Sequence, residues 1–181
     1  MMNQLRFLKR VSGLLRSWRF YTSSDVDAAH LSQELNFEKL SKSHVVTQLL
    51  DAANVSFTKQ HDERLANGDA FVCILNDADE LLSYGWSTSR IQMPISELGL
   101  LLNSGEDETL YDFHTPEQHR NQGYYTCLLS NLAILSRNCW IYAHSKNIPS
   151  CKAIERSGFT RKSSIKLLCS GKFSLIDTQG A

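Results

Sequence analysis

The chain lacks several features that would place it in a specialised class of protein. No apolar run approaches the roughly 20 residues that a helix needs to cross a bilayer, so stable membrane insertion is not expected. Its 19 basic and 19 acidic residues cancel, which argues against a nucleic-acid binder. Its five cysteines form no Cys-x-x-Cys pair, so we expect core thiols in the reducing cytoplasm, with no disulfide framework and no metal site.

What is present describes an ordinary globular domain with a basic N-terminal segment. A chain of 181 residues with 42% hydrophobic and 21% charged content predicts one domain, which we place at residues 18–181. Residues 1–17 carry Arg6, Lys9, Arg10 and Arg16 and no acid, and they have helical spacing interrupted at Gly13. They predict a helical extension that either touches an anionic membrane, acts as a transit-like peptide, or packs on the domain or on a second subunit of a homodimer.

Apolar spacing and turn residues predict the order of the elements in the domain. Strands are expected at residues 18–22, 70–75, 81–88, 110–115, 139–143, 159–168 and 172–176. Helices are expected at residues 124–136 and 149–158, and two more between 25 and 60, divided near Asn36 or at residues 41–43. Residues 91–108 show no regular pattern.

One stretch has the composition of a phosphate-binding loop. The aromatic strand 110–115 ends at Pro116, a polar turn follows, and the helix begins near Tyr124. The first turn of a helix has unpaired backbone N–H groups and the positive end of the helix dipole. Gly123 permits close approach of the backbone to a ligand. The segment from Arg120 to Tyr125 therefore predicts an anion site.

The loop resembles a family signature. Arg120-x-x-Gly123-x-Tyr125 is similar to the Arg/Gln-x-x-Gly-x-Gly/Ala loop of the GNAT superfamily of N-acetyltransferases, which holds the pyrophosphate of acetyl-CoA. Residues 147–159, from Asn147 through a short helix to Gly158-Phe159, resemble the second signature of that superfamily. Together the similarity covers roughly residues 68–168.

The resemblance implies a fold and a cofactor. The fold would be a single α/β (α+β) domain with a central, mixed, mostly antiparallel twisted sheet of about seven strands flanked by helices. Strands 110–115 and 139–143 would splay apart to form the acetyl-CoA cleft, and the amine would arrive from the opposite side. The implied cofactor-binding residues are Thr115, Arg120, Asn121, Gln122, Gly123, Tyr124, Tyr125, Asn147 and Ser150. Lys146 or Lys152 would meet the 3′-phosphate.

Acetyl transfer to an amine needs a group that removes a proton from the amine. Asp112 interrupts an apolar strand, and burial there would raise its pKa toward a useful range, so it is the first candidate base. The strand also resembles that of some GNAT aminoglycoside acetyltransferases, whose Asp is the base. The alternative is a structural carboxylate bound to backbone N–H groups or to an arginine. His114 and His144, which end the two strands at the expected cleft, are rival candidates.

Two positions depart from the family pattern. Tyr125 stands where the loop usually has Gly or Ala, and Ile154 stands where many members carry a tyrosine as general acid. Tyr111, Tyr124 or Tyr142 are substitutes for that acid, and a thiolate, whose thiol has a pKa of about 8.5, can also leave unassisted.

The resemblance and these residues predict an acetyl-CoA-dependent N-acetyltransferase. We expect direct attack by a small-molecule primary amine in a ternary complex, the acceptor being an amino sugar or a nucleotide-linked amino sugar. The alternatives are a non-catalytic or regulatory CoA-binding domain, a transferase acting on a protein or peptide amine, and a transferase of longer acyl chains.

Overall fold

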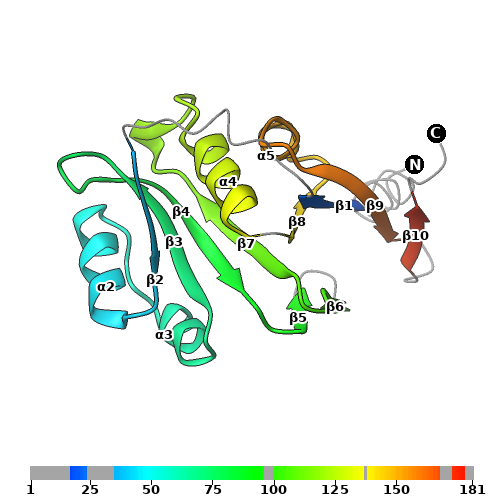
Figure 1. Ribbon diagram of the computed structural model, residues 1–181, viewed down its shortest axis with the longest axis horizontal. Helices are drawn as coiled ribbons and strands as arrows, with labels where there is room; N and C mark the ends of the chain where they lie inside the picture. The colour runs from blue at the N-terminus through cyan, green and yellow to red at the C-terminus, as the bar shows by residue number, and fades with distance from the viewer. Residues whose placement is uncertain (1–16, 24–34, 96–99, 137, 168–172, 178–181) are drawn as a thin grey trace, which may run out of the picture.

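The computed structural model describes residues 17–23, 35–95, 100–136, 138–167 and 173–177 (Figure 1). Its helices are α2 (Ser43–Ala52), α3 (Lys59–Ala66), the short 3₁₀ helix η2 (Glu117–His119), α4 (Tyr124–Leu135) and α5 (Ile148–Arg156). Its strands are β1 (Ser17–Ser23), β2 (Asn36–Leu40), β3 (Ala70–Leu75), β4 (Leu81–Thr88), β5 (Gln92–Ile95), β6 (Leu100–Asn103), β7 (Glu108–His114), β8 (Cys139–His144), β9 (Thr160–Leu167) and β10 (Phe173–Asp177). The expected extension at residues 1–17 and helix near Asp25 lie almost wholly outside the described residues.

Eight of these strands form one mixed sheet in the order β10-β9-β1-β8-β7-β4-β3-β2. All neighbouring pairs are antiparallel except β7 and β8, which run parallel at the centre. The predicted class of sheet is therefore confirmed. The first strand, β1, lies between β8 and β9, so the two ends of the described chain meet in one half of the sheet (Figure 1).

One sequence expectation about these elements was wrong, and one pair of strands was not predicted. Residues 36–40 were placed within the helices but form β2, whose only neighbour in the sheet is β3. Residues 91–108 were left without structure, yet β5 and β6 pair there as a separate two-stranded sheet. In both cases the residues of the strand have only a weak preference for strand structure, and pairing with a neighbouring strand stabilises it.

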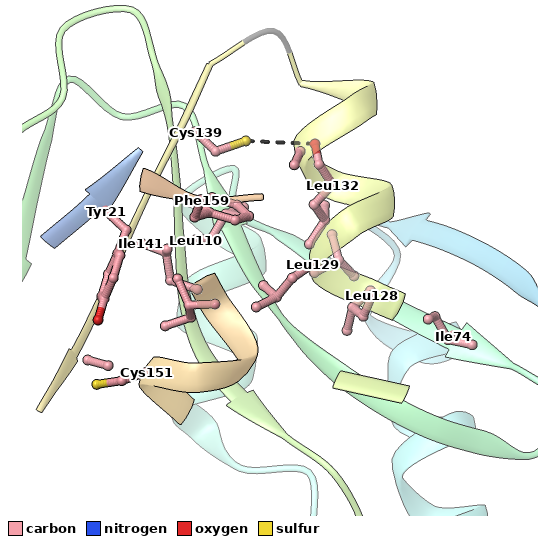
Figure 2. Close-up of a cluster of buried hydrophobic side chains, with 14 of the residues drawn as sticks. Tyr21, Ile74, Leu110, Leu128, Leu129, Leu132, Cys139, Ile141, Cys151 and Phe159 are labelled. Carbon is pink, nitrogen blue, oxygen red and sulfur yellow. Dashed lines mark hydrogen bonds between the residues drawn. The ribbon is translucent and has the colours of Figure 1, made fainter. Parts of the chain in front are cut away.

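The two faces of the sheet carry different helices, as the alternation of strand side chains dictates. Leu128, Leu129 and Leu132 of α4 and Ile154 of α5 pack on one face against Ile74, Leu110 and Ile141 (Figure 2). On the other face, Val46 and Leu50 of α2 pack against Phe71, Trp86 and Tyr111. The β5–β6 hairpin covers Trp18 and Phe20 on that second face.

The central parallel strands separate part-way along their length. Their ladder holds only from Glu108 opposite Cys139 to Leu110 opposite Ile141, although both strands continue. The predicted splaying of these strands is confirmed. Since β8 does not pair with β7 beyond Leu110, backbone groups of β7 are left for a ligand.

A bulge in β7 accompanies the separation. Trp86 pairs with Tyr111 and Tyr84 with His114, so Asp112 and Phe113 together face the single residue Gly85. Asp112 has a φ of 54°, in the left-handed region that Asp tolerates better than most residues. A bulge bends its strand and increases the local twist, which turns the end of β7 away from β8.

Gly85 makes this bulge sterically feasible. A Cβ added there would lie 2.4 Å from Cδ1 of Phe113, whose ring covers the glycine. We expect Gly85→Ala to lower the free energy of unfolding by about 1–3 kcal/mol, measured by urea denaturation, because buried β4 cannot give way. The double variant Gly85→Ala/Phe113→Ala should recover part of the lost free energy of unfolding. If the effects of the two substitutions simply added, the proposed clash between them would be contradicted.

Candidate functional site

The loop between β7 and α4 has the geometry of an anion site. Asn121 and Gly123 have positive φ values of 63° and 85°, and Gly123 is the N-cap of α4. The first bond of the helix runs from Cys127 N–H to Gly123 O at 2.9 Å, so the N–H groups of the first turn are outside the helical ladder. Arg120 is exposed and its Nε donates to Thr115 O at 3.1 Å, which anchors the guanidinium beside this turn.

A cavity of about 740 Å³, here called the loop cavity, opens over this turn. Its lining residues are Phe113, His114, Thr115, His119, Arg120, Asn121, Gly123, Tyr124, Tyr125, Thr126, Asn147, Pro149, Ser150, Lys152, Ala153 and Arg156. All the predicted cofactor residues except Gln122 are therefore brought together; Gln122 instead donates from Nε2 to Gln118 O. Lys152 and Arg156 are one turn apart on α5, and Arg156 was missed because a lone arginine in a helix carries no distinguishing signal.

A second cavity, of about 460 Å³ and here called the central cavity, lies where β7 and β8 separate. Residues from both strands line it, among them Asp112, Phe113, Tyr142 and His144. It shares Phe113, Tyr125, Asn147 and Ser150 with the loop cavity. The two cavities are thus adjacent, and these four residues form part of the wall of each.

A third cavity, of about 610 Å³ and here called the outer cavity, lies between α3, the β5 strand and β7. Its lining residues are Gln60, Glu63, Arg64, Asn67, Arg90, Met93, Pro94, Tyr111, Asp112 and Tyr142. It shares Tyr111, Asp112 and Tyr142 with the central cavity. Asp112 therefore stands where a ligand from one side would meet a ligand from the other.

The expected burial of Asp112 was wrong. The bulge turns the side chain outward, where 61% of it is exposed and Oδ2 accepts from Arg64 Nη2 at 2.7 Å. This contact matches the alternative that the sequence offered for Asp112, a carboxylate bound to an arginine. The Arg64 side chain is only 12% exposed, and its Cζ lies 5.1 Å from the ring centres of both Trp86 and Tyr111.

The two candidate histidines lie in different cavities. His114 lines the loop cavity, and burial, followed by the nearby Arg120, lowers its pKa, so the imidazole is neutral at pH 7. His144 lines the central cavity, and its Nδ1 accepts from the backbone N–H of Lys146 at 3.1 Å. A neutral His144 consequently carries its proton on Nε2, which makes it a donor toward the cavity.

Tyr111 and Tyr125 have different surroundings. Tyr111 donates its hydroxyl to Oδ2 of the buried Asp69, and burial and that carboxylate raise its pKa. Ile154 is fully buried in the core and does not line the cleft. Tyr125 lies in the wall shared by the loop and central cavities, with its hydroxyl 3.2 Å from Ser150 Oγ, and burial raises its pKa to about 12.

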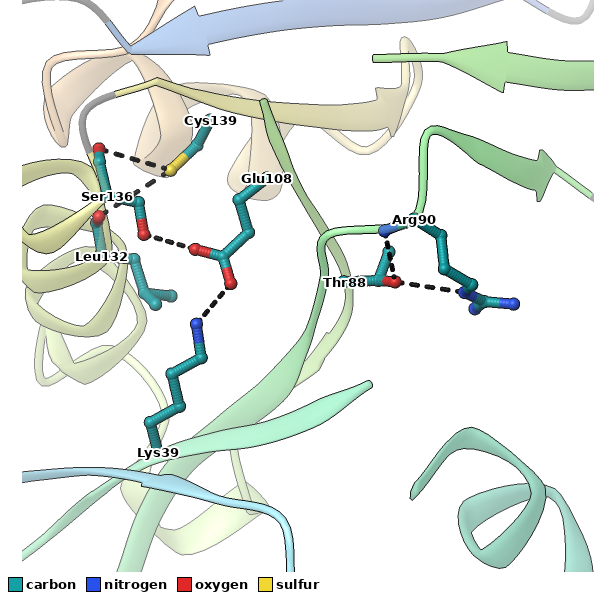
Figure 3. A network of polar contacts seen from close by, with 7 residues as sticks. All are labelled: Lys39, Thr88, Arg90, Glu108, Leu132, Ser136 and Cys139. Atoms are coloured by element: carbon teal, nitrogen blue, oxygen red, sulfur yellow. Dashed lines mark hydrogen bonds and ion pairs between the residues drawn. The ribbon is translucent and has the colours of Figure 1, made fainter. Parts of the chain in front are cut away.

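Glu108 is a structural residue at the start of β7. It accepts from Lys39 Nζ and Ser136 Oγ, tying β2 and α4 to the start of β7 (Figure 3). Burial alone would raise its pKa, but these donors outweigh burial and the pKa is lowered.

That lowered pKa predicts a pH-dependent contribution to stability. The contribution of Glu108 should be present above its unfolded pKa of about 4.3 and should disappear as the pH falls through the lower folded value. Glu108→Gln is expected to reduce the free energy of unfolding by about 1–3 kcal/mol at pH 7, with the difference from wild type shrinking near pH 3. Denaturant melts at both pH values test this, with the exposed Glu106→Gln as control; a gap independent of pH would contradict it.

The sheet therefore opens at its centre between two parallel strands, beside the first turn of a helix, with a cavity on each side of β7. No protein-family model and no curated protein sequence matches this chain. Solved structures do match it in fold. A GNAT-family acetyltransferase from Colwellia psychrerythraea has a TM-score of 0.55 at 14% identity, over 90% of this chain and 56% of that one.

Two further structures match in the same way. A GCN5-related N-acetyltransferase from Sphaerobacter thermophilus has a TM-score of 0.54 at 9% identity, over 92% of this chain and 55% of that one. A tandem GNAT protein from the clavulanic acid biosynthesis pathway has a TM-score of 0.51 at 8% identity, with the same coverage. The chain spans little more than half the length of these structures. It has the fold of the GNAT superfamily of N-acetyltransferases.

None of the helices in the described part of the chain has the length and apolar character that crossing a bilayer requires.

Proposed function

We propose that this protein is an acetyl-CoA-dependent N-acetyltransferase that acetylates a primary amine. The observation that carries the proposal is the row of three adjacent cavities across the splayed strands, in which the central cavity shares lining residues with each of the other two. The loop cavity would hold the pyrophosphate of acetyl-CoA and the central cavity its pantetheine arm. The outer cavity would admit the amine, with Asp112 at the meeting point. An amino sugar or a nucleotide-linked amino sugar is the acceptor class that the β7 strand resemblance favours.

The proposed chemistry is direct transfer. The amine nitrogen attacks the thioester carbonyl carbon, the C–S bond breaks, and the products are an amide and CoA. The bound ammonium first loses one proton to Asp112, or through it to water, and attacks as the neutral amine; the second proton leaves after attack and goes to the departing thiolate. Backbone N–H groups of β7 beyond Leu110, where the ladder with β8 has ended, would stabilise the oxyanion.

Tyr125 is the residue that we assign to the leaving thiolate. It borders both cavities that the cofactor would occupy, and its raised pKa keeps the phenol protonated throughout the assay range. We expect Tyr125→Phe to lower kcat by about tenfold with acetyl-CoA affinity unchanged, because one hydrogen bond to an ionised group is lost. Tyr124→Phe, whose ring packs against His119 and borders only the loop cavity, is the control. Equal kcat values for Tyr125→Phe and wild type would remove this role.

The test of the function has two stages. Acetyl-CoA should raise the melting temperature of the full chain by mass action, and thiol release should then appear with amines. No shift at millimolar acetyl-CoA would contradict the proposal. A shift without thiol release on any amine would instead support a non-catalytic CoA-binding domain, the second candidate, which the burial of Ile154 in the core favours.

We also propose a cytoplasmic location. Cys73, Cys139 and Cys151 are free thiols, which suits a reducing compartment. Recovery of the protein outside the cytoplasmic fraction of its cell would contradict this.

A further inference from the structure

The outer cavity has charges of both signs in its wall. Arg64 and Arg90 supply two cations, and Glu63 and Asp112 supply two anions. Glu63 also pairs with Lys59, on the outside of α3, at 3.3 Å. The lining is therefore balanced, so it offers little to a substrate that carries positive charge alone.

Arg90 is a fixed cation with donors to spare. Its Nη2 donates to Oδ2 of the buried Asp69 at 2.7 Å, and its Nε donates to Thr88 Oγ1 at 3.1 Å (Figure 3 shows the Thr88 contact). Tyr111 fixes the same Asp69 oxygen from the other side. These contacts use two of the five N–H donors of a guanidinium, and 36% of the Arg90 side chain remains exposed.

Arg64 adds a second guanidinium to the same wall. Its Nη2 is committed to Asp112, and the rings of Trp86 and Tyr111 hold its plane in place. Its Nη1 is buried and has no hydrogen-bond partner among the described residues. Arg64 is therefore held beside Asp112, and Arg90 is the more exposed of the two arginine side chains in this wall.

The position of the carboxylates fixes where the amine would lie. Asp112 is exposed and lines both the outer and the central cavity, whereas Glu63 lines the outer cavity alone. A substrate ammonium would bind there, which leaves the Arg90 end of the cavity for the rest of the acceptor. An ammonium at one end and a guanidinium at the other match a substrate with one charge of each sign.

We propose that the acceptor is an amine that also carries a carboxylate or phosphate group, with the anion bound by Arg90 and the amine held at Asp112. This inference rests on the proposed acetyltransferase function and narrows its substrate class. An amino sugar bearing a phosphate or a nucleoside diphosphate falls within the class. A neutral amino sugar and a simple polyamine fall outside it.

Matched pairs of amines test the inference on the wild-type protein with saturating acetyl-CoA. The carboxylate arm compares 4-aminobutyrate with 1-aminobutane. The phosphate arm compares 2-aminoethyl phosphate with ethanolamine, and glucosamine 6-phosphate with glucosamine. We expect kcat/KM to favour the anionic member of at least one pair by about tenfold or more, as a charge-assisted hydrogen bond would give. Preference for the neutral member in every pair, or equal rates, would overturn the proposal, and the arm that responds identifies the anion.

Variants of Arg90 test whether this residue causes the preference for anionic amines. Arg90→Gln should raise KM for the anionic amine and leave kcat nearly unchanged, so that the ratio of kcat/KM within a pair falls toward one. Arg90→Lys keeps a cation beside Asp69 but loses the planar fork, and it should give an intermediate ratio. Because the ratio compares two substrates on the same sample, partial unfolding of a variant does not affect it. Lys59→Gln, which removes an exposed cation outside the cavity, is the matched control.

The two proposals fail in different ways. Loss of acetyl-CoA binding in the wild-type protein would remove the acetyltransferase assignment, and this inference with it. Efficient thiol release with neutral amines, together with an Arg90→Gln variant whose ratios equal those of wild type, would overturn the anionic-acceptor proposal and leave the acetyltransferase assignment standing.

Discussion

Replacing Asp112 by Asn is expected to lower kcat/KM for the amine by about 10²–10⁴-fold while acetyl-CoA still binds. Asn adopts the left-handed conformation that the β7 bulge requires at this position, so the backbone should be kept. The carboxylate that orients the ammonium and accepts its proton is lost. Steady-state thiol release and an acetyl-CoA titration by thermal shift measure the two properties separately.

The pH profile distinguishes a base from a binding group. If Asp112 accepts the proton, the deficit of Asp112→Asn should shrink as the pH rises toward about 10, where an alkyl amine is already neutral. Glu63→Gln provides the control, because Glu63 is an exposed carboxylate in the same cavity and is already paired with Lys59. A kcat/KM of Asp112→Asn equal to that of wild type would eliminate Asp112 from catalysis.

Replacing Arg120 by Ala is expected to weaken acetyl-CoA binding by about 10–100-fold, the effect of losing hydrogen bonds to a charged phosphate. The guanidinium is anchored at Thr115 O beside the first turn of α4, and its N–H groups would bond the pyrophosphate. Calorimetric titration with acetyl-CoA gives the change in Kd. An unchanged Kd would contradict the assignment of this loop to the pyrophosphate.

A truncated ligand separates the pyrophosphate from the 3′-phosphate. We assign the latter to Lys152 and Arg156, which lie one turn apart on α5 at the loop cavity. The double variant Lys152→Ala/Arg156→Ala should weaken CoA but not dephospho-CoA, whereas Arg120→Ala should weaken both by similar factors. Equal losses of both ligands in the double variant would show that α5 does not read the 3′-phosphate.

The sequence predicted those parts of the fold that depend on local patterns. The apolar spacing of α4, the continuous apolar run of β3 and the glycine at 123 are each properties of a few neighbouring residues, and the structure has elements at these places. Arg120 came from loop chemistry that is equally local, and Asn147 came from the family resemblance; Asn147 does accept from the N–H of Ser150 at 3.3 Å. The arrangement of the loop cavity was therefore within reach of sequence reasoning.

What the sequence could not predict depends on residues far apart in the chain. The outward turn of Asp112 results from a bulge opposite Gly85, and no pattern within β7 distinguishes a bulged aspartate from a buried one. The charges of the outer cavity come from α3, from the turn before β5 and from β7, which only the folded sheet brings together. Arg64 and Arg90 were overlooked for this reason, since each alone resembles a solvated surface residue.

The place of β1 in the sheet has a consequence for how the protein is made. Trp18 pairs with His144 and with Ile165. β1 is therefore synthesised early, but it can pair only after β8 and β9 have left the ribosome. Contacts of such long sequence separation slow folding, and unpaired strand edges promote association between incomplete chains. β2, β3 and β4 follow one another in the chain, and each pairs with the next. The nascent chain should therefore acquire protease resistance in two steps, with the half that contains β1 becoming resistant only after β9 has been released.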